Sequence, residues 1–191
     1  MRDDPSAGWE AVAGEFEALR SNIGADVVLH WARDIPRGAE ILDIGCGTGW
    51  PIATGLASLG LVVSGVDPSP TLLAAFHRNL PSAAAACETA QSSSFFGRRF
   101  DAAIAIGLIF LLDETDQRAL IRRVRDALHR GGRFLFSAPE QPCGWADSLT
   151  GRPSRSLGAS VYHATLLEAG FELGHDVGDT GGNHYFTAIA V

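Results

Sequence analysis

Three glycines that follow a short apolar run are the residues of this sequence best placed to hold a ligand. Residues 41–44 are apolar apart from Asp43, and Gly45, Gly47 and Gly49 come directly after them. Where a strand runs into glycines and then a helix, backbone N–H groups and the helix N-terminus can approach a polar ligand closely. In an open α/β sheet such ligands lie at the carboxyl ends of the central strands. The pattern therefore predicts a cofactor-binding loop at this point of the chain.

Two classes of cofactor compete for this loop. A dinucleotide site has the pattern Gly-x-Gly-x-x-Gly, in which the third glycine lets the helix pack closely on the strand. Here the third position holds Trp50. Asp43, two residues before the first glycine, would repel a pyrophosphate but can serve a cationic ligand. Both features disfavour NAD.

Four segments in sequence order resemble the motifs of the class I S-adenosylmethionine-dependent methyltransferases. These segments are residues 41–49, Asp67 at the end of the second expected strand, residues 100–104, and residues 128–135, where Arg130 replaces the usual proline. The resemblance covers about residues 38–137. It implies S-adenosylmethionine as the cofactor, S-adenosylhomocysteine as the product, and methyl transfer by in-line displacement.

The resemblance also assigns residues to the cofactor. Asp67 matches the acidic residue that binds the ribose, and a carboxylate can accept hydrogen bonds from both ribose hydroxyls. Glu88 stands where the family often has an aspartate that holds the adenine amino group, although a solvated loop glutamate is the alternative. Cys46 stands at a position where a small packing residue is also expected. The expected cofactor-binding residues are Asp43, Gly45, Cys46, Gly47, Gly49, Asp67, Pro68, Glu88, Thr89 and Ile106.

These motifs do not name the methyl acceptor, because the cofactor carries the reactivity and a base is needed only for some nucleophiles. Residues 106–111 are apolar, whereas amino-methylating nucleic-acid and glutamine methyltransferases carry Asn/Asp-Pro-Pro-Tyr/Phe there. We therefore expect a small-molecule acceptor, no nucleic-acid or membrane partner, and a monomer or homodimer. The alternative is a catalytically silent protein that binds S-adenosylmethionine as a regulator or partner subunit.

Chain direction suggests which residues meet the acceptor. The last strand is expected to begin at the edge of the sheet where the cofactor lies, which brings His184 and Tyr185 near it. His184 is the candidate base, because imidazole titrates near neutrality; a packing or surface histidine is the alternative. Tyr185 is the second candidate catalytic residue, and no metal is expected. The expected acceptor contacts are Phe110, Trp145 and Arg20.

Expected strands alternate with expected helices, which predicts a parallel sheet covered on both faces. The strands are residues 40–44, 61–66, about 83–87, 101–107, 132–137, about 171–177 and 184–190. About six residues join the last two strands, too few for a parallel crossover, so the last strand should run antiparallel. We expect a doubly wound, Rossmann-like α/β fold with seven strands, and the resemblance implies the order 3-2-1-4-5-7-6. Only about 13 residues join the third and fourth strands, so the helix between them should be reduced or absent.

The remaining segments are expected to cover the site within a single methyltransferase domain of residues 1–191. Helical spacing over residues 7–20 and 22–33 predicts an N-terminal helical lid within residues 1–35. The polar, glycine- and proline-rich residues 138–158 are expected to cover the active site.

Composition narrows the function further. The chain has 191 residues and a net charge of −7, which argues against broad nucleic-acid binding. All 15 basic residues are arginine, so lysine Schiff-base and P-loop chemistry are excluded. The three cysteines are widely spaced, and no signal peptide or membrane span is evident. A cytoplasmic location is therefore expected.

Overall fold

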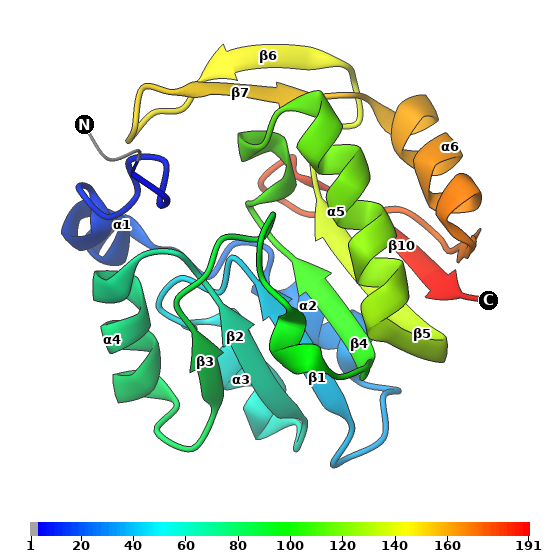
Figure 1. Ribbon diagram of the computed structural model, residues 1–191, viewed down its shortest axis with the longest axis horizontal. Helices are drawn as coiled ribbons and strands as arrows, with labels where there is room; N and C mark the ends of the chain where they lie inside the picture. Colours follow the sequence, from blue (N-terminus) through cyan, green and yellow to red (C-terminus); the bar gives the residue numbers. More distant parts are fainter. Residues whose placement is uncertain (1–3) are drawn as a thin grey trace.

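The computed structural model describes residues 4–191. It has one large sheet with helices on both faces and a separate two-stranded hairpin beyond one end of the sheet (Figure 1). The strands of the large sheet are β1 (Glu40–Ile44), β2 (Val62–Val66), β3 (Ala84–Ala86), β4 (Phe100–Ala105), β5 (Leu128–Ser137), β8 (Phe171–Leu173), β9 (Val177–Gly178) and β10 (His184–Ala190). The α-helices are α1 (Ala13–Leu19), α2 (Ala25–Ala32), α3 (Ile52–Ser58), α4 (Pro70–Asn79), α5 (Glu114–Ala127) and α6 (Ala159–Ala169).

The strand order confirms the expected topology. Strands follow one another as β3-β2-β1-β4-β5-β10-β8, which is the order 3-2-1-4-5-7-6 when β8 and β10 count as the sixth and seventh strands. The pairs from β3 to β5 are parallel, and β10 runs antiparallel to both β5 and β8. The short strand β9 pairs with the first residues of β10. The last strand is therefore reversed, as the short connection before it requires.

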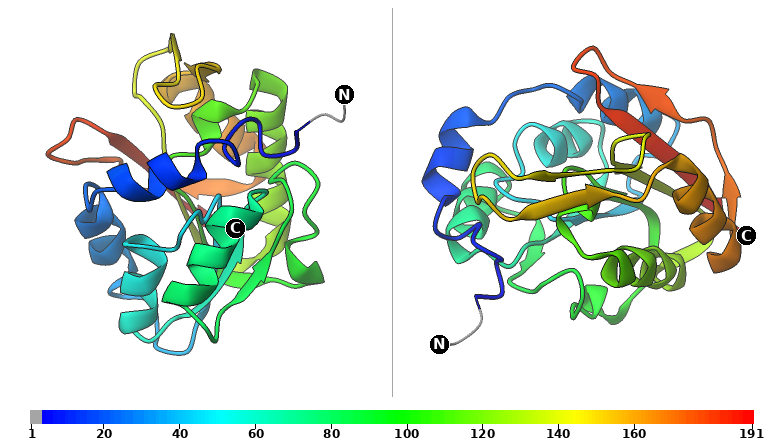
Figure 2. Two further views of the ribbon diagram at one scale, coloured as in Figure 1. Left: turned by 90° about the vertical axis from the view of Figure 1, so that its left-hand side faces the viewer. Right: turned by 90° about the horizontal axis from the view of Figure 1, so that it is seen from above.

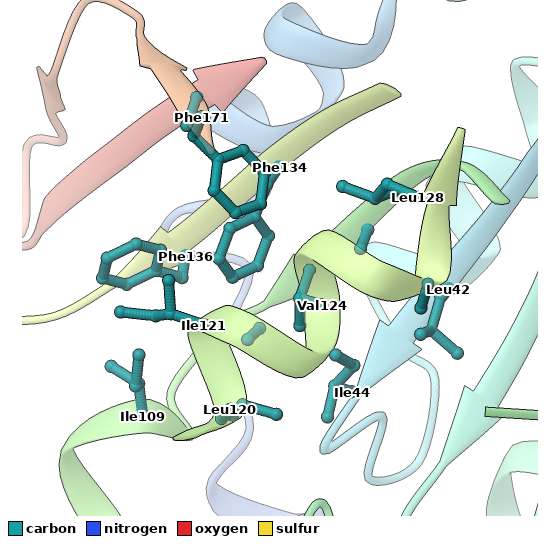
Figure 3. Close-up of a cluster of buried hydrophobic side chains, with 14 of the residues drawn as sticks. Leu42, Ile44, Ile109, Leu120, Ile121, Val124, Leu128, Phe134, Phe136 and Phe171 are labelled. Atoms are coloured by element: carbon teal, nitrogen blue, oxygen red, sulfur yellow. The ribbon is translucent and has the colours of Figure 1, made fainter. Parts of the chain in front are cut away.

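Alternation along the strands divides the apolar side chains between two cores. Leu42 and Ile44 pack with α5 and α6 on one face, whereas Ile41 packs with α2, α3 and α4 on the other. Figure 3 shows the first core, where Ile121 and Val124 of α5 lie among aromatic side chains of the sheet. This packing fixes the strands whose carboxyl ends form the site.

The connection between β3 and β4 confirms the expected loss of a helix. Within it the structure has only one turn of 3₁₀-helix, η1 (Phe95–Gly97). A second 3₁₀ turn, η2 (Ile109–Leu111), follows β4. Asp113 then caps α5 by accepting a hydrogen bond from the Asp116 amide at 2.8 Å.

Two segments differ from the sequence-based expectation. Residues 138–158 contain a hairpin of β6 (Cys143–Ala146) and β7 (Pro153–Ser156), whose turn is closed by hydrogen bonds to the Asp147 carboxylate. The N-terminal helices are shorter than predicted. Turns precede α1, and Gly24 separates α1 from α2 with a left-handed φ of 82°. Figure 2 shows the N-terminal segment and the hairpin at the same end of the sheet.

Within residues 4–191 no helix is both long enough and apolar enough to cross a membrane.

Candidate active site

A cleft opens at the carboxyl ends of β1, β2 and β4, where the glycine loop lies. It has a volume of about 980 Å³, including its open mouth, and its walls come from the glycine loop, the loops after β2, β3 and β4, and the N-terminal segment. The expected cofactor residues that line it are Gly45, Cys46, Gly47, Asp67, Pro68, Thr89 and Ile106.

The first two glycines present bare backbone to the cleft. Both have left-handed backbone, with φ of 73° at Gly45 and 51° at Gly47. A Cβ at Gly45 would lie 3.2 Å from side-chain atoms of Leu108, and one at Gly47 would lie 3.3 Å from the Phe16 ring. Side chains at these positions would therefore be strained and would narrow the cleft. Gly49 lies outside the lining, and a Cβ there would approach Phe76 to 2.7 Å, so this glycine allows α4 to pack.

Asp67 is held in place by two backbone amides. Its Oδ2 accepts a hydrogen bond from Gly47 N at 2.9 Å, and its Oδ1 accepts one from Ser69 N at 2.9 Å. A carboxylate oxygen can accept two hydrogen bonds, and within residues 4–191 each Asp67 oxygen accepts one hydrogen bond. Each oxygen can therefore accept one more. Burial raises the pKa of Asp67, while the Ser69 and Gly47 amides lower it. The carboxylate is thus oriented to receive hydroxyl donors.

A buried carboxylate and an arginine lie near the glycine loop. Burial raises the pKa of Asp43 from 3.8 to about 7, although the Arg20 charge acts in the opposite direction. Asp43 lies outside the lining, but Arg20 lines the cleft. The Arg20 Nε donates to the Trp50 carbonyl at 3.4 Å, and its guanidinium lies 5.5 Å from the centre of the Phe16 ring. This end of the cleft therefore has the Arg20 cation in its lining and the buried Asp43 carboxyl group behind it.

The loop after β3 forms the opposite wall. Thr89, Ala90 and Gln91 line the cleft, whereas Glu88 does not. The Glu88 Oε2 is nevertheless buried and has no hydrogen-bond partner within residues 4–191. A buried acceptor without a donor is costly, so this oxygen is a natural place for a ligand N–H group. The position fits the predicted adenine contact.

The N-terminal segment lines the cleft and is joined to α4 by a contact that the sequence did not reveal. Pro5, Ser6, Ala7 and Trp9 line the cleft. The neighbouring Glu10 accepts hydrogen bonds from the Ser69 and Thr71 hydroxyls and from the Thr71 amide at the start of α4. Its carboxylate therefore interacts favourably with the N-terminus of that helix. The partners lie about 60 residues apart in sequence, and no local pattern signals the contact.

The structure does not bring the two candidate catalytic residues into the cleft. His184 lies on the α6 face of the sheet, where its Nε2 is 3.3 Å from Asp176 Oδ2 and its ring packs on Phe186 at 4.6 Å. Tyr185 points to the opposite face and is buried, and its hydroxyl donates to Asp179 Oδ2 at 2.8 Å. Burial, with the Asp179 carboxylate, raises the pKa of Tyr185, so the group remains a phenol. Neither position supports the catalytic role predicted for it.

The predicted acceptor contacts separate into two groups. Arg20 lines the cleft, but Phe110 and Trp145 are outside its lining and pack on each other, with ring centres 5.3 Å apart. Leu108, together with Leu111 and Leu112 from the same loop, forms the apolar wall in their place. Within residues 4–191 there is no group of three or more His, Cys, Asp and Glu side chains that could hold a metal ion.

Comparison with known proteins agrees with this geometry. The methyltransferase-domain family model matches residues 41–132. A ubiquinone biosynthesis O-methyltransferase of Methylobacterium nodulans is 30% identical over 139 residues, which are 68% of this chain and 55% of that protein. An uncharacterized methyltransferase of Mycobacterium bovis is 28% identical over 151 residues, 78% of this chain and 59% of that protein. The chain thus spans little more than half the length of these curated relatives.

Solved structures share the fold at low sequence identity. The methyltransferase CcbJ of Streptomyces caelestis is 19% identical, with a TM-score of 0.77 over 99% of both chains. A 1,6-didemethyltoxoflavin N1-methyltransferase of Burkholderia thailandensis, solved with its acceptor and S-adenosylhomocysteine, is 18% identical. Its TM-score is 0.78, over 95% of this chain and 84% of that one. These structures share the predicted fold, residues 41–132 match the methyltransferase-domain family, and the predicted resemblance to the class I S-adenosylmethionine-dependent enzymes is confirmed.

Proposed function

We propose that this protein transfers a methyl group from S-adenosylmethionine to a small-molecule acceptor. The observation that carries the proposal is the arrangement of Asp67 against the glycine loop. Its carboxylate lines the cleft and is fixed by the Gly47 and Ser69 amides, yet each oxygen keeps an acceptor position. A ribose offers two adjacent hydroxyl donors that match such a carboxylate.

The residues around the cleft fit the other parts of this cofactor. The bare backbone at Gly45 and Gly47 leaves room for its methionine part, and Arg20 supplies a cation for the carboxylate. Asp43 is buried beside the same end, and its ionised form would suit the ammonium and sulfonium groups. The unpartnered Glu88 Oε2 suits the adenine amino group, with Thr89 beside it in the wall.

When bound, S-adenosylmethionine supplies a methyl group on a sulfonium, which a nucleophile displaces in line. The chain contributes orientation and exclusion of water, because Phe16 and Leu108 cover the glycine loop with apolar surface. Among residues 4–191, the ionisable side chains in the lining are those of Arg20, Cys46 and Asp67. Burial raises the pKa of the Cys46 thiol, and the acceptor positions that Asp67 keeps beside its amide donors are the ones assigned to the ribose. We therefore infer an acceptor that needs no general base, such as a neutral amine or an anionic oxygen or sulfur.

Two further parts of the proposal concern what surrounds the cleft. The N-terminal segment acts as a lid, and the β6–β7 hairpin covers the same side. A Cβ added at Gly8 would lie 3.5 Å from the Arg152 side chain in the hairpin turn, so the two segments lie next to each other. A cytoplasmic location and a monomeric or homodimeric state stay predictions from the sequence.

The test uses S-adenosylmethionine that carries an isotopically labelled methyl group. The protein is incubated with small amines, phenols, thiols and acids, and mass spectrometry follows labelled products and S-adenosylhomocysteine together. We expect both products in equal amounts with at least one acceptor, and much less of both with Asp67→Ala at the same subsaturating cofactor concentration. Tight cofactor binding with no transfer to any acceptor would instead support the regulatory alternative. Binding of NAD without any response to S-adenosylhomocysteine would overturn both.

A further inference from the structure

The loop between β3 and β4 has an unusual backbone for a segment that forms part of the cleft wall. Phe95 and Phe96 have left-handed backbone with φ of 49° and 60°, and Gly97 follows with 62°. Residues other than glycine adopt this conformation at an energetic cost and keep it only where surrounding contacts hold them. No α-helix supports the described residues 87–99 from within, so the support must come from another element.

That support comes from Arg123 on α5. One guanidinium nitrogen, Nη1, donates to the Ala90 carbonyl, and the other, Nη2, donates to the Ser93 carbonyl. The same guanidinium lies over the Phe95 ring, 4.7 Å from its centre. The Ser93 hydroxyl in turn accepts a hydrogen bond from the Phe95 amide at 3.0 Å. The Arg123 side chain thus contacts both ends of the segment 90–93 and also the ring of Phe95, which has the left-handed backbone.

The residues held in this way face the cleft on their other side. Ala90 is buried and lines the cleft between Thr89 and Gln91. Gln91 has its own link to α5, because its Nε2 donates to Asp116 Oδ2 at 3.0 Å. Hydrogen bonds from Gln91 to Asp116 and from Arg123 to Ala90 therefore join this stretch of wall to α5 at two points.

We propose that Arg123 is a positioning residue for the cofactor, which fixes the wall that receives the adenine ring without touching the ligand. This inference rests on the proposed function, since it assumes that adenine lies against residues 88–91. The planar fork of arginine matches the task, because it donates to two carbonyls in fixed directions. A lysine ammonium is a point charge on a flexible stem and cannot hold both carbonyls in the same geometry.

The test compares Arg123→Lys and Arg123→Gln with Arg122→Gln. Arg122 is the preceding residue on the same helix; it is half-exposed, its guanidinium is 3.7 Å from the Glu168 carboxylate, and it is outside the cleft lining. Calorimetry measures the affinity for S-adenosylhomocysteine, and hydrogen exchange with mass spectrometry follows peptides of residues 87–99. Thermal melting reports whether each variant is folded, and if Arg123→Gln does not fold, the lysine variant decides.

We expect both Arg123 variants to bind S-adenosylhomocysteine about tenfold more weakly, because binding must then order a wall that has lost charge-assisted hydrogen bonds to Arg123. Exchange should become faster in residues 87–99 and stay unchanged in the glycine loop. The KM for the cofactor should rise while kcat at saturating cofactor stays within about twofold, and Arg122→Gln should behave as the wild type.

Two results would overturn the inference. Faster exchange in residues 87–99 with unchanged affinity would mean that Arg123 supports the loop without affecting the ligand. Unchanged exchange in that loop would mean that Arg123 does not hold it. A wild-type protein that does not bind S-adenosylhomocysteine would contradict the proposed function itself, and the two failures are therefore distinguishable.

Discussion

Replacing Asp43 with asparagine should make the protein more stable, and the gain should grow with pH. Asp43 is enclosed beneath the glycine loop, and burial raises its pKa from 3.8 to about 7 despite the Arg20 charge. The folded state therefore holds a proton on this group in a pH range where the unfolded state has released it. It follows that the wild type loses stability as the pH rises from about 4 toward 7, and little more above 8.

The expected size follows from the two pKa values. Each pKa unit corresponds to about 1.4 kcal/mol, so the complete shift of about 3 units costs about 4 kcal/mol. Some of this stability has already been lost at pH 5, and the group in the folded state ionises near pH 7. Between pH 5 and pH 8 the free energy of unfolding of the wild type should therefore fall by about 2–3 kcal/mol. Asparagine has nearly the same shape and no charge, so Asp43→Asn should not show this loss.

The assay is urea unfolding of the ligand-free protein at pH 5, 6, 7 and 8. The difference in free energy of unfolding between Asp43→Asn and the wild type should increase by about 2–3 kcal/mol across this range. Asp126→Asn, at an exposed position on α5, serves as the control and should show a nearly constant difference. A constant difference for Asp43→Asn as well would refute the argument that the Asp43 carboxylate is buried at a cost.

Four other substitutions test the roles assigned to residues in and near the site. Asp67→Ala should weaken S-adenosylhomocysteine binding by about 1–3 kcal/mol in calorimetry, because the cofactor would lose its ribose acceptor; unchanged affinity would remove Asp67 from the site. Glu10→Gln loses the charged contact at the start of α4, so S-adenosylhomocysteine should dissociate several-fold faster in stopped-flow measurements; an unchanged rate would argue against a lid. Tyr185→Phe should lower the free energy of unfolding by about 1–2 kcal/mol, because it removes the bond to Asp179. With that variant and with His184→Ala, kcat should stay within about twofold of the wild type, and a 10²-fold loss would restore the catalytic role predicted from the sequence.

The sequence predicted the parts of the fold that depend on local pattern and chain length. Strand order was implied by the resemblance to the methyltransferase family, and the reversal of β10 followed also from the few residues before it. The glycine loop was found because close approach of backbone to a ligand requires those residue types, and Asp67 was assigned through the family resemblance. The missing helix before β4 followed from the length of the connection alone.

The sequence was less informative wherever side chains distant in the chain meet. Chain direction placed His184 and Tyr185 at the correct edge of the sheet, but alternate residues of a strand point to opposite faces. The register of β10 then turned His184 toward α6 and Tyr185 toward α2, with neither in the cleft. The contacts of Glu10 and Arg123 likewise join separate elements, and nothing in the neighbouring sequence predicts them.

The most direct measurement is a crystal structure of the protein with S-adenosylhomocysteine. The ribose hydroxyls should lie within hydrogen-bond distance of the Asp67 carboxylate. The adenine should lie against residues 88–91, and the carboxylate of the homocysteine part should face Arg20. A ligand bound outside the cleft, or one in the cleft that leaves Asp67 without a ribose contact, would contradict the proposed site.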